Sequence, residues 1–236
     1  YYDLVASQSD AYQYIFFLSR YLPEWGGEAV ANHPKMELVI GDAHKYLMET
    51  SENFDCIIMD ISDPIEAGPG IALYTQEFYQ RAAKVLSKNG VFVTQAGSAP
   101  FVPLPHDFPT DGDGKNKTES SCFSPIRNTL ATVFDNAIPY AVPLASFGEN
   151  WGFVIAFNNG PDDSASGRSL VDLSPERIDS LIEERIEAVE GIPEHRSRSR
   201  GVKRAVTGKK KGGDVLRHYD GVAHRGLFSL SKPLRE

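Results

Sequence analysis

The sequence predicts an α/β protein with a mainly parallel sheet, and three observations lead to this fold class. Residues 56–59 form a continuous apolar run without alternation, which is typical of a parallel strand covered on both faces. Between residues 36 and 157 the predicted elements follow the order strand, helix, strand, helix, strand, helix, strand, strand. The last two strands are joined too tightly for a parallel crossover, so one of them must be antiparallel.

Apolar runs and helix-end signals define the elements before residue 100. Strands are predicted at residues 4–6, 36–40, 56–59 and 91–95, and helices at 11–22, 43–48 and 75–87. Thr75 is expected to cap the last of these helices, and Asn89 and Gly90 to close it. Residues 63–72 contain Pro64, Gly68, Pro69 and Gly70 and are predicted to form a loop.

The elements after residue 100 are separated by polar segments. Residues 100–121 are rich in Pro, Gly, Asp and Lys and predict a flexible surface insertion. Ser124 followed by Pro125 predicts a helix that runs to Phe134, and Ser174 predicts another capped helix to about Val189. Strands are expected at residues 137–144, 151–157 and 227–230.

This pattern matches the second half of a class I methyltransferase-like (Rossmann-like) sheet. We expect the first strand of that sheet to be missing from this chain. Residues 1–190 are predicted to form a partial catalytic domain, and residues 191–236 a C-terminal extension. Within the extension, residues 195–211 carry eight Lys or Arg and no acid, which favours a solvated loop over a nucleic-acid patch.

Composition and charge limit the classes of function. The chain has 236 residues, of which 41% are hydrophobic and 24% charged, and its formal net charge is -8. This charge argues against a nucleic-acid surface and is compatible with a cationic substrate. Two cysteines, no signal peptide and no long apolar stretch lead us to expect a cytoplasmic protein without membrane contact. The histidines show no metal-ligand spacing, so no metal is expected.

Candidate site residues stand at three predicted strand ends: Asp42 followed by Ala43, Asp60 with Asp63, and Gln95. Ligands of open α/β sheets bind beyond the carboxyl ends of the strands, so these residues are candidates for one site. Asp, Ser and Pro are also ordinary turn residues, and Asp42 could simply cap the following helix. The spacing alone therefore does not define a function.

Taken together, the motifs resemble the spermidine synthase family, the polyamine aminopropyltransferases. They are Gly-Asp-Ala at residues 41–43, Asp-Ile-Ser-Asp-Pro at 60–64, Leu-Tyr-Thr at 73–75 and Thr-Gln-Ala at 94–96. The loop at residues 65–69 and the tail at 219–233 look closer to thermospermine and spermine synthases. The family's Gly-rich loop and first strand have no counterpart in the sequence.

The resemblance implies transfer of an aminopropyl group from decarboxylated S-adenosylmethionine, a co-substrate, to spermidine. It implies Asp60 as the proton acceptor, and Asp63, Gln95 and Tyr74 as substrate-binding residues. Asp42 and Ala43 would contact the adenine end of the co-substrate. Phe147 and Trp151 are candidates for an aromatic wall of the site. No tightly bound cofactor is expected.

Two other functions remain open at this point. A methyltransferase on the same sheet would use S-adenosylmethionine, whose carboxylate a second acid in the site would repel. The missing Gly-rich loop would instead suit a non-catalytic fragment that binds polyamines or a protein partner. The sequence does not separate thermospermine, spermine and spermidine as products. We expect a homo-oligomer, whose size the sequence does not define.

Overall fold

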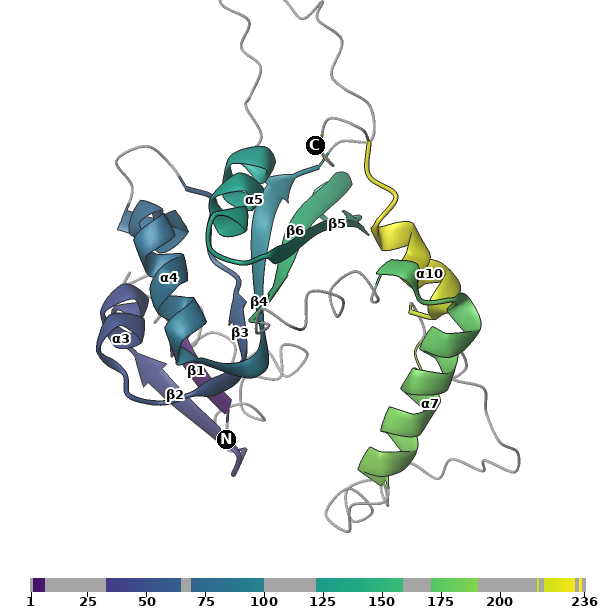
Figure 1. Ribbon diagram of the computed structural model, residues 1–236, viewed down its shortest axis with the longest axis horizontal. Coiled ribbons are helices and arrows are strands. Elements are labelled where there is room, and N and C mark those ends of the chain that lie inside the picture. The colour runs from purple at the N-terminus through teal and green to yellow at the C-terminus, as the bar shows by residue number, and fades with distance from the viewer. Residues whose placement is uncertain are drawn as a thin grey trace, which may run out of the picture.

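The computed structural model describes residues 2–6, 33–64, 69–99, 122–158, 171–190, 216, 219–231 and 234 (Figure 1). In chain order its elements are β1 (Tyr2–Ala6), β2 (Met36–Ile40), α3 (Ala43–Glu49), β3 (Phe54–Met59), the 3-10 helix η2 (Pro69–Tyr74), α4 (Gln76–Val85), β4 (Leu86–Ser98), α5 (Phe123–Ala131), β5 (Asn136–Leu144), β6 (Glu149–Phe157), α7 (Pro175–Glu190) and α10 (Gly221–Leu227). The segments predicted at 11–22, 100–121 and 195–211 lie outside the described residues.

The described strands form two sheets, and the larger one is mixed. β1 and β2 pair in parallel, while the larger sheet has the order β3-β4-β6-β5. β3 and β4 are parallel, but β6 runs antiparallel to both β4 and β5. The predicted α/β class with one antiparallel strand is confirmed. The expectation of a mainly parallel sheet is wrong for this larger sheet, because β6 lies between β4 and β5 and so makes two antiparallel pairs.

β3 lies at an edge of the larger sheet, and this changes the prediction for residues 56–59. Ile57 packs against the core and Met59 is buried, as their apolar character predicts. Cys56 is exposed, however, and the Ile58 side chain is 73% exposed. Among the described residues, β3 is therefore covered on one face only, and the expectation of two covered faces is wrong.

The hydrophobic core lies between one face of the larger sheet and two helices. Phe92 and Val154 point from neighbouring strands into this core, and both are fully buried. α4 contributes Tyr79 and α5 contributes Leu130, which are also fully buried. Alternate side chains of a strand point to one face, and those of β4 and β6 thereby meet the apolar stripes of α4 and α5. This packing holds β3 and β4 in register where their carboxyl ends approach each other.

The N-terminal end of α4 is as predicted, but its C-terminal end is not. Thr75 Oγ1 accepts a hydrogen bond from Phe78 N at 3.3 Å, which confirms Thr75 as the cap. The helix ends at Val85, and β4 begins directly at Leu86. Asn158 Nδ2 donates to the carbonyls of Ala83, Leu86 and Ser87 at 3.0–3.2 Å. These hydrogen bonds satisfy carbonyls at the helix end that would otherwise accept from the next turn of a longer helix. The helix therefore stops at Val85, and Asn89 and Gly90 lie in β4 instead of closing the helix.

Three other boundaries differ from the sequence predictions. α5 begins at Phe123 after Cys122, so Ser124 and Pro125 stand in its first turn, where proline costs no helical hydrogen bond. The predicted loop at 63–72 contains η2 from Pro69. Residues 227–230 do not form a strand, because α10 occupies residues 221–227; its cap is Asp220, whose Oδ1 accepts from Ala223 N at 2.7 Å.

α10 packs against α7, as Figure 1 shows beside the β5–β6 hairpin. Gly221 N donates to Asp179 Oδ1 at 2.8 Å. A Cβ atom on Gly221 would lie 2.0 Å from the Pro175 carbonyl oxygen. This approach is therefore open only to glycine. The division of the chain at residue 190 stays a prediction, and the α7–α10 contact crosses it.

We expect Gly221→Ala to destabilise the protein by about 1–3 kcal/mol, because the added methyl group forces the two helices apart. Gly226→Ala in the same helix is the matched control, since a Cβ atom added there would have no other atom within 4 Å. Alanine is the better helix former, so the control should be neutral or slightly stabilising. Urea unfolding followed by circular dichroism measures both. Equal effects of the two substitutions would contradict the close contact.

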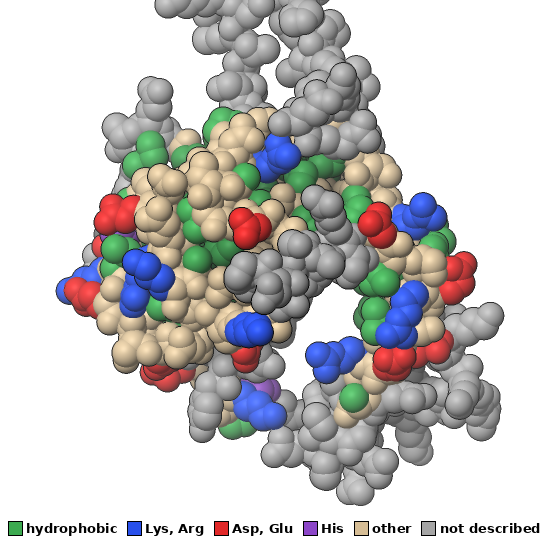
Figure 2. Space-filling view, in the orientation of Figure 1, with side chains coloured by type: hydrophobic (Ala, Val, Ile, Leu, Met, Phe, Trp, Pro, Cys, Tyr) green, Lys and Arg blue, Asp and Glu red, His purple; other side chains and the backbone are tan. Residues whose placement is uncertain are grey.

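Charged side chains of both signs are interspersed on the face shown in Figure 2, including along α7. One pair on α7, Arg177 and Glu184, lies 3.1 Å apart with both side chains more than half exposed. Such a pair contributes at most about 1 kcal/mol. None of the described helices has the length and apolar character needed to cross a bilayer.

Candidate active site

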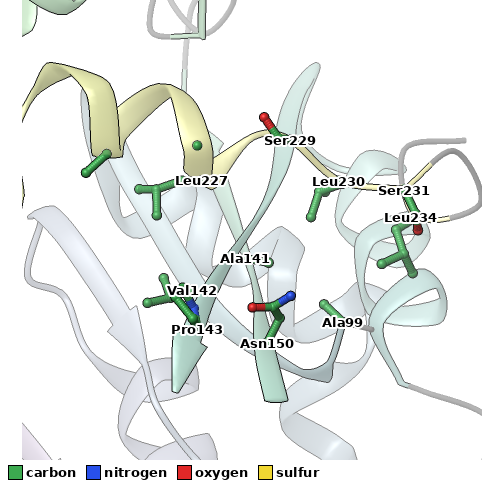
Figure 3. Close-up of a pocket in the computed structure, with 12 residues that line it drawn as sticks. Ala99, Ala141, Val142, Pro143, Asn150, Leu227, Ser229, Leu230, Ser231 and Leu234 are labelled. Atoms are coloured by element: carbon green, nitrogen blue, oxygen red, sulfur yellow. The ribbon is translucent and has the colours of Figure 1, made fainter. Parts of the chain in front are cut away.

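Two cavities of the described residues are candidates for a site, and the larger one carries little chemistry. It measures about 550 Å³ and lies between the β5–β6 hairpin and the C-terminal segment (Figure 3). Val142 and Asn150 face it from the hairpin, and Leu227 and Leu230 from the opposite side. No titratable side chain is among its described lining residues. It therefore offers no group for proton transfer.

The smaller cavity, of about 370 Å³, lies at the carboxyl end of β3 and contains the acids predicted from the sequence. It is lined by Asp60, Ile61, Ser62, Asp63, Gln95, Phe147 and Trp151. No Lys, Arg or His is among these described lining residues, so neither carboxylate is neutralised by a cationic side chain of the lining. Two carboxylates in one cavity favour a cationic ligand.

The backbone after β3 places the two acids differently. Met59 is buried and fixes the end of the strand, and Asp60, the next residue, is exposed. The strand ends at Met59, so Asp60 and Asp63 lie in the segment that follows it, and Pro64 cannot donate a hydrogen bond that would extend the sheet. Asp63 is only partly exposed and accepts a hydrogen bond at Oδ1 from Gln95 Nε2 at 2.8 Å. Asp60 is thus the more accessible carboxylate, and Asp63 the more tightly held one.

Gln95 connects the end of β4 to the loop after β3. It is 4% exposed, and its Nε2 also lies 2.6 Å from the Ile61 carbonyl oxygen and 3.0 Å from the Tyr74 hydroxyl. Its Oε1 accepts from Gly97 N at 2.9 Å and from the Trp151 indole N–H at 3.0 Å. A buried carboxamide with this many partners has a fixed position.

Tyr74 supports the site from behind and does not line the cavity. Its side chain is 8% exposed, and its hydroxyl donates to the Ser62 carbonyl at 3.1 Å. Burial raises the pKa of Tyr74 far above its usual range, and the hydrogen bond with Gln95 opposes this shift only in part. The hydroxyl therefore stays protonated and remains a hydrogen-bond donor to the loop. The sequence-based role of Tyr74 as a direct substrate contact stays a prediction.

The β5–β6 hairpin brings two aromatic residues to the acids. Phe147 and Trp151 have ring centroids 4.5 Å apart at an interplanar angle of 48°, and both line the cavity. Gly148 makes the turn between them with φ of 71°, a conformation that favours glycine. The hairpin thereby supplies an apolar side to an otherwise acidic cavity, at the positions considered for an aromatic wall.

Asp42 and Ala43 do not line this cavity. Asp42 caps α3, because its Oδ1 accepts from Lys45 N at 3.1 Å, and its side chain is exposed. This is the capping role that the sequence left open beside a contact with adenine. The two roles are compatible, since the second carboxylate oxygen has no hydrogen bond among the described residues.

Gly97 was not identified from the sequence as part of the site. It has φ of 79°, and a Cβ atom there would lie 3.2 Å from Asp63 Oδ2. The Ala-Gly-Ser sequence after Gln95 resembles an ordinary strand end, so no local signal marks this approach of backbone to carboxylate. The described residues contain no group of three or more His, Cys, Asp and Glu that could hold a metal ion.

Comparisons with known proteins agree with the motifs. The spermine/spermidine synthase domain matches residues 13–104. Polyamine aminopropyltransferase 2 of Hyperthermus butylicus is 33% identical over 217 residues, which make up 92% of this chain and 54% of that protein. Thermospermine synthase of Arabidopsis thaliana is 37% identical over 153 residues, or 64% of this chain and 38% of that protein.

A solved structure shows the same fold. The crystal structure of spermidine synthase from Thermotoga maritima matches with a TM-score of 0.56 at 19% identity, over 98% of this chain and 58% of that one. The chain thus spans only a little more than half the length of the Hyperthermus and Thermotoga proteins that it matches. By the identity to the curated aminopropyltransferases and the matching domain, the chain belongs to the spermidine synthase family.

Proposed function

We propose that this chain carries the polyamine site of an aminopropyltransferase, which moves an aminopropyl group from decarboxylated S-adenosylmethionine to spermidine. The observation that carries the proposal is one cavity lined by two carboxylates, Asp60 and Asp63, and two aromatic residues, Phe147 and Trp151, with no cationic side chain in its described lining. A polyamine has ammonium groups separated by methylenes. The carboxylates attract the ammonium groups, and the aromatic rings can contact both the methylenes and the cations.

Asp60 is the proposed proton acceptor. In the reaction a polyamine nitrogen attacks the methylene next to a sulfonium; the new C–N bond forms as the C–S bond breaks and leaves a neutral thioether. The nitrogen attacks only as a free amine, and deprotonating an amine of pKa ~10.4 at pH 7 costs about 4.6 kcal/mol. A carboxylate beside the nitrogen takes up this proton as bond formation proceeds. Asp60 suits this role because it is the exposed acid of the cavity.

Asp63 is the proposed anchor for an amine that stays protonated. Gln95 holds its Oδ1 by a hydrogen bond, and its Oδ2 lies where a side chain at Gly97 would crowd it. A fixed carboxylate sets the position of one ammonium group and, through the methylene spacing, that of the attacking nitrogen. Gln95 lines the same cavity and is proposed to hold Asp63 and to contact the substrate.

The remaining assignments rest on the family motifs. Asp42 and Ala43, at the end of β2, are proposed to contact the adenine end of decarboxylated S-adenosylmethionine. Thermospermine or spermine is the proposed product, in line with the identity to the Arabidopsis thermospermine synthase. Residues 1–190 are the proposed catalytic region of this chain. A homo-oligomeric state and a cytoplasmic location remain parts of the proposal.

Isothermal titration calorimetry with spermidine tests the proposed site. Spermidine should bind, binding should weaken as salt screens the carboxylates, and the Asp60→Asn/Asp63→Asn double variant should lose it. The Asp179→Asn/Glu184→Gln double variant on α7 is the charge-matched control and should bind normally. Tight binding of S-adenosylmethionine without spermidine binding would support a methyltransferase instead. Binding of neither compound would leave a partner-binding module.

A further inference from the structure

The Gln95 carboxamide joins two elements that are far apart in the sequence. Its oxygen accepts from Trp151 on β6, and its nitrogen donates to Asp63 in the loop after β3. The three side chains thereby form one hydrogen-bonded chain, from Trp151 through Gln95 to Asp63, in the lining of the cavity. Gln95 is buried in the middle of this chain, and all three residues are among those that line the cavity.

The chemistry of the partners fixes the orientation of the carboxamide. The indole N–H of Trp151 and the backbone N–H of Gly97 only donate, and both meet Oε1. The Asp63 carboxylate and the Ile61 carbonyl only accept, and both meet Nε2. A reversed carboxamide would place donors against donors and an oxygen against a carboxylate. Only the observed orientation satisfies every partner.

We propose that Trp151 is a positioning residue for Asp63, acting through Gln95. Loss of the indole N–H leaves Oε1 with one donor, so the carboxamide is held less firmly and so is the carboxylate that it contacts. This inference deepens the proposed function and, for its binding readout, rests on it. It differs from a wall role, which needs the aromatic ring of Trp151 but not its N–H.

Substitution by phenylalanine separates the two roles, because Phe keeps an aromatic face and lacks the donor. Trp151→Phe should weaken spermidine binding roughly 2- to 10-fold, the range for one neutral hydrogen bond. When Trp151→Phe is added to the Gln95→Met variant, spermidine binding should change less than about 2-fold, because the hydrogen bonds from Trp151 to Gln95 and from Gln95 to Asp63 are already lost. Phe147→Leu is the matched control. It should change spermidine binding by the same factor in the otherwise unchanged protein and in the Gln95→Met variant, since the contact of Phe147 with Trp151 is one between rings.

Calorimetry on the full chain gives these four comparisons, with thermal melting to confirm that each variant is folded. Strong coupling between Trp151→Phe and Gln95→Met supports the proposal. If Trp151→Phe weakens binding by the same factor in both backgrounds, Trp151 acts as a wall alone and the proposal is wrong.

A second readout does not depend on polyamine binding, and so it separates failure of this inference from failure of the proposed function. The chain has two tryptophans, so the Trp151 indole N–H resonance is assigned in a ¹⁵N spectrum by its loss in Trp151→Phe. Gln95→Met should shift that resonance and speed its hydrogen exchange. Asp63→Asn should shift it more than Asp60→Asn, which removes an equal charge from the same cavity. Equal shifts from the two asparagine variants would overturn the proposed connection to Asp63, whether or not spermidine binds.

Discussion

Asp60→Asn is expected to lower turnover by roughly 10²- to 10⁴-fold in any form of the protein that transfers aminopropyl groups. The amide has nearly the shape of the carboxylate, so it fits the exposed position after Met59 without disturbing the core. It cannot take up the proton of the attacking amine, and the reaction then depends on the small fraction of free amine at neutral pH. Chromatography of the polyamine products measures the rate.

Asp55→Asn is the matched control for this prediction. Asp55 lies on β3, the strand that ends just before Asp60, and is exposed; its Oδ1 accepts from Ser87 Oγ at 2.7 Å, a bond that an asparagine oxygen can also accept. This variant makes the same chemical change away from the cavity, and turnover should stay within about 2-fold. Spermidine affinity measured in parallel separates a loss of chemistry from a loss of binding. Turnover by Asp60→Asn close to that of Asp55→Asn would remove Asp60 from the mechanism.

The parts of the site that could be predicted are those encoded by consecutive residues. An apolar strand followed by two acids and a proline specifies its own exit from the sheet, so Asp60 and Asp63 could be placed from the sequence. The capping position of Asp42 is similarly local, which is why it could be weighed as an alternative. By contrast, the hydrogen bond of Gln95 with Trp151 depends on pairing between β4 and β6, 56 residues apart.

The incorrect fold predictions have the same origin. The end of α4 is set by Asn158, more than 70 residues away in the chain, and no signal near residue 85 reveals this partner. The coverage of residues 56–59 depends on what lies beside β3, since an apolar run alone does not distinguish an edge strand from a central one. Residues 227–230 have the sequence Leu-Phe-Ser-Leu, which is too short to define a strand, and Leu227 instead ends the helix that Asp220 caps.

The largest expected effect on stability is at Phe92, whose side chain is fully buried. Its ring packs edge-on against Tyr79 of α4 at 5.5 Å and stacks with Phe134 at 6.0 Å. On β4 it lies between Ile57 of β3 and Ala156 of β6 in the sheet register. Phe92 therefore holds the helical layer to the strand pair whose ends carry Asp60 and Gln95.

Phe92→Ala is expected to lower the free energy of unfolding by about 3–5 kcal/mol, because it leaves a cavity that α4, Phe134 and two neighbouring strands cannot close by small shifts. Typical domains unfold with only about 5–15 kcal/mol, so the variant should be partly unfolded or close to it at 37 °C. Phe147→Ala removes the same side chain at a site that is 55% exposed and should cost less than about 1 kcal/mol. Urea unfolding of both variants tests the pair. A loss below about 1 kcal/mol at Phe92 would mean that the sheet and α4 are held together by other contacts. The expected loss would place Phe92 in the scaffold and outside the site, provided that spermidine binding weakens only as far as the protein unfolds.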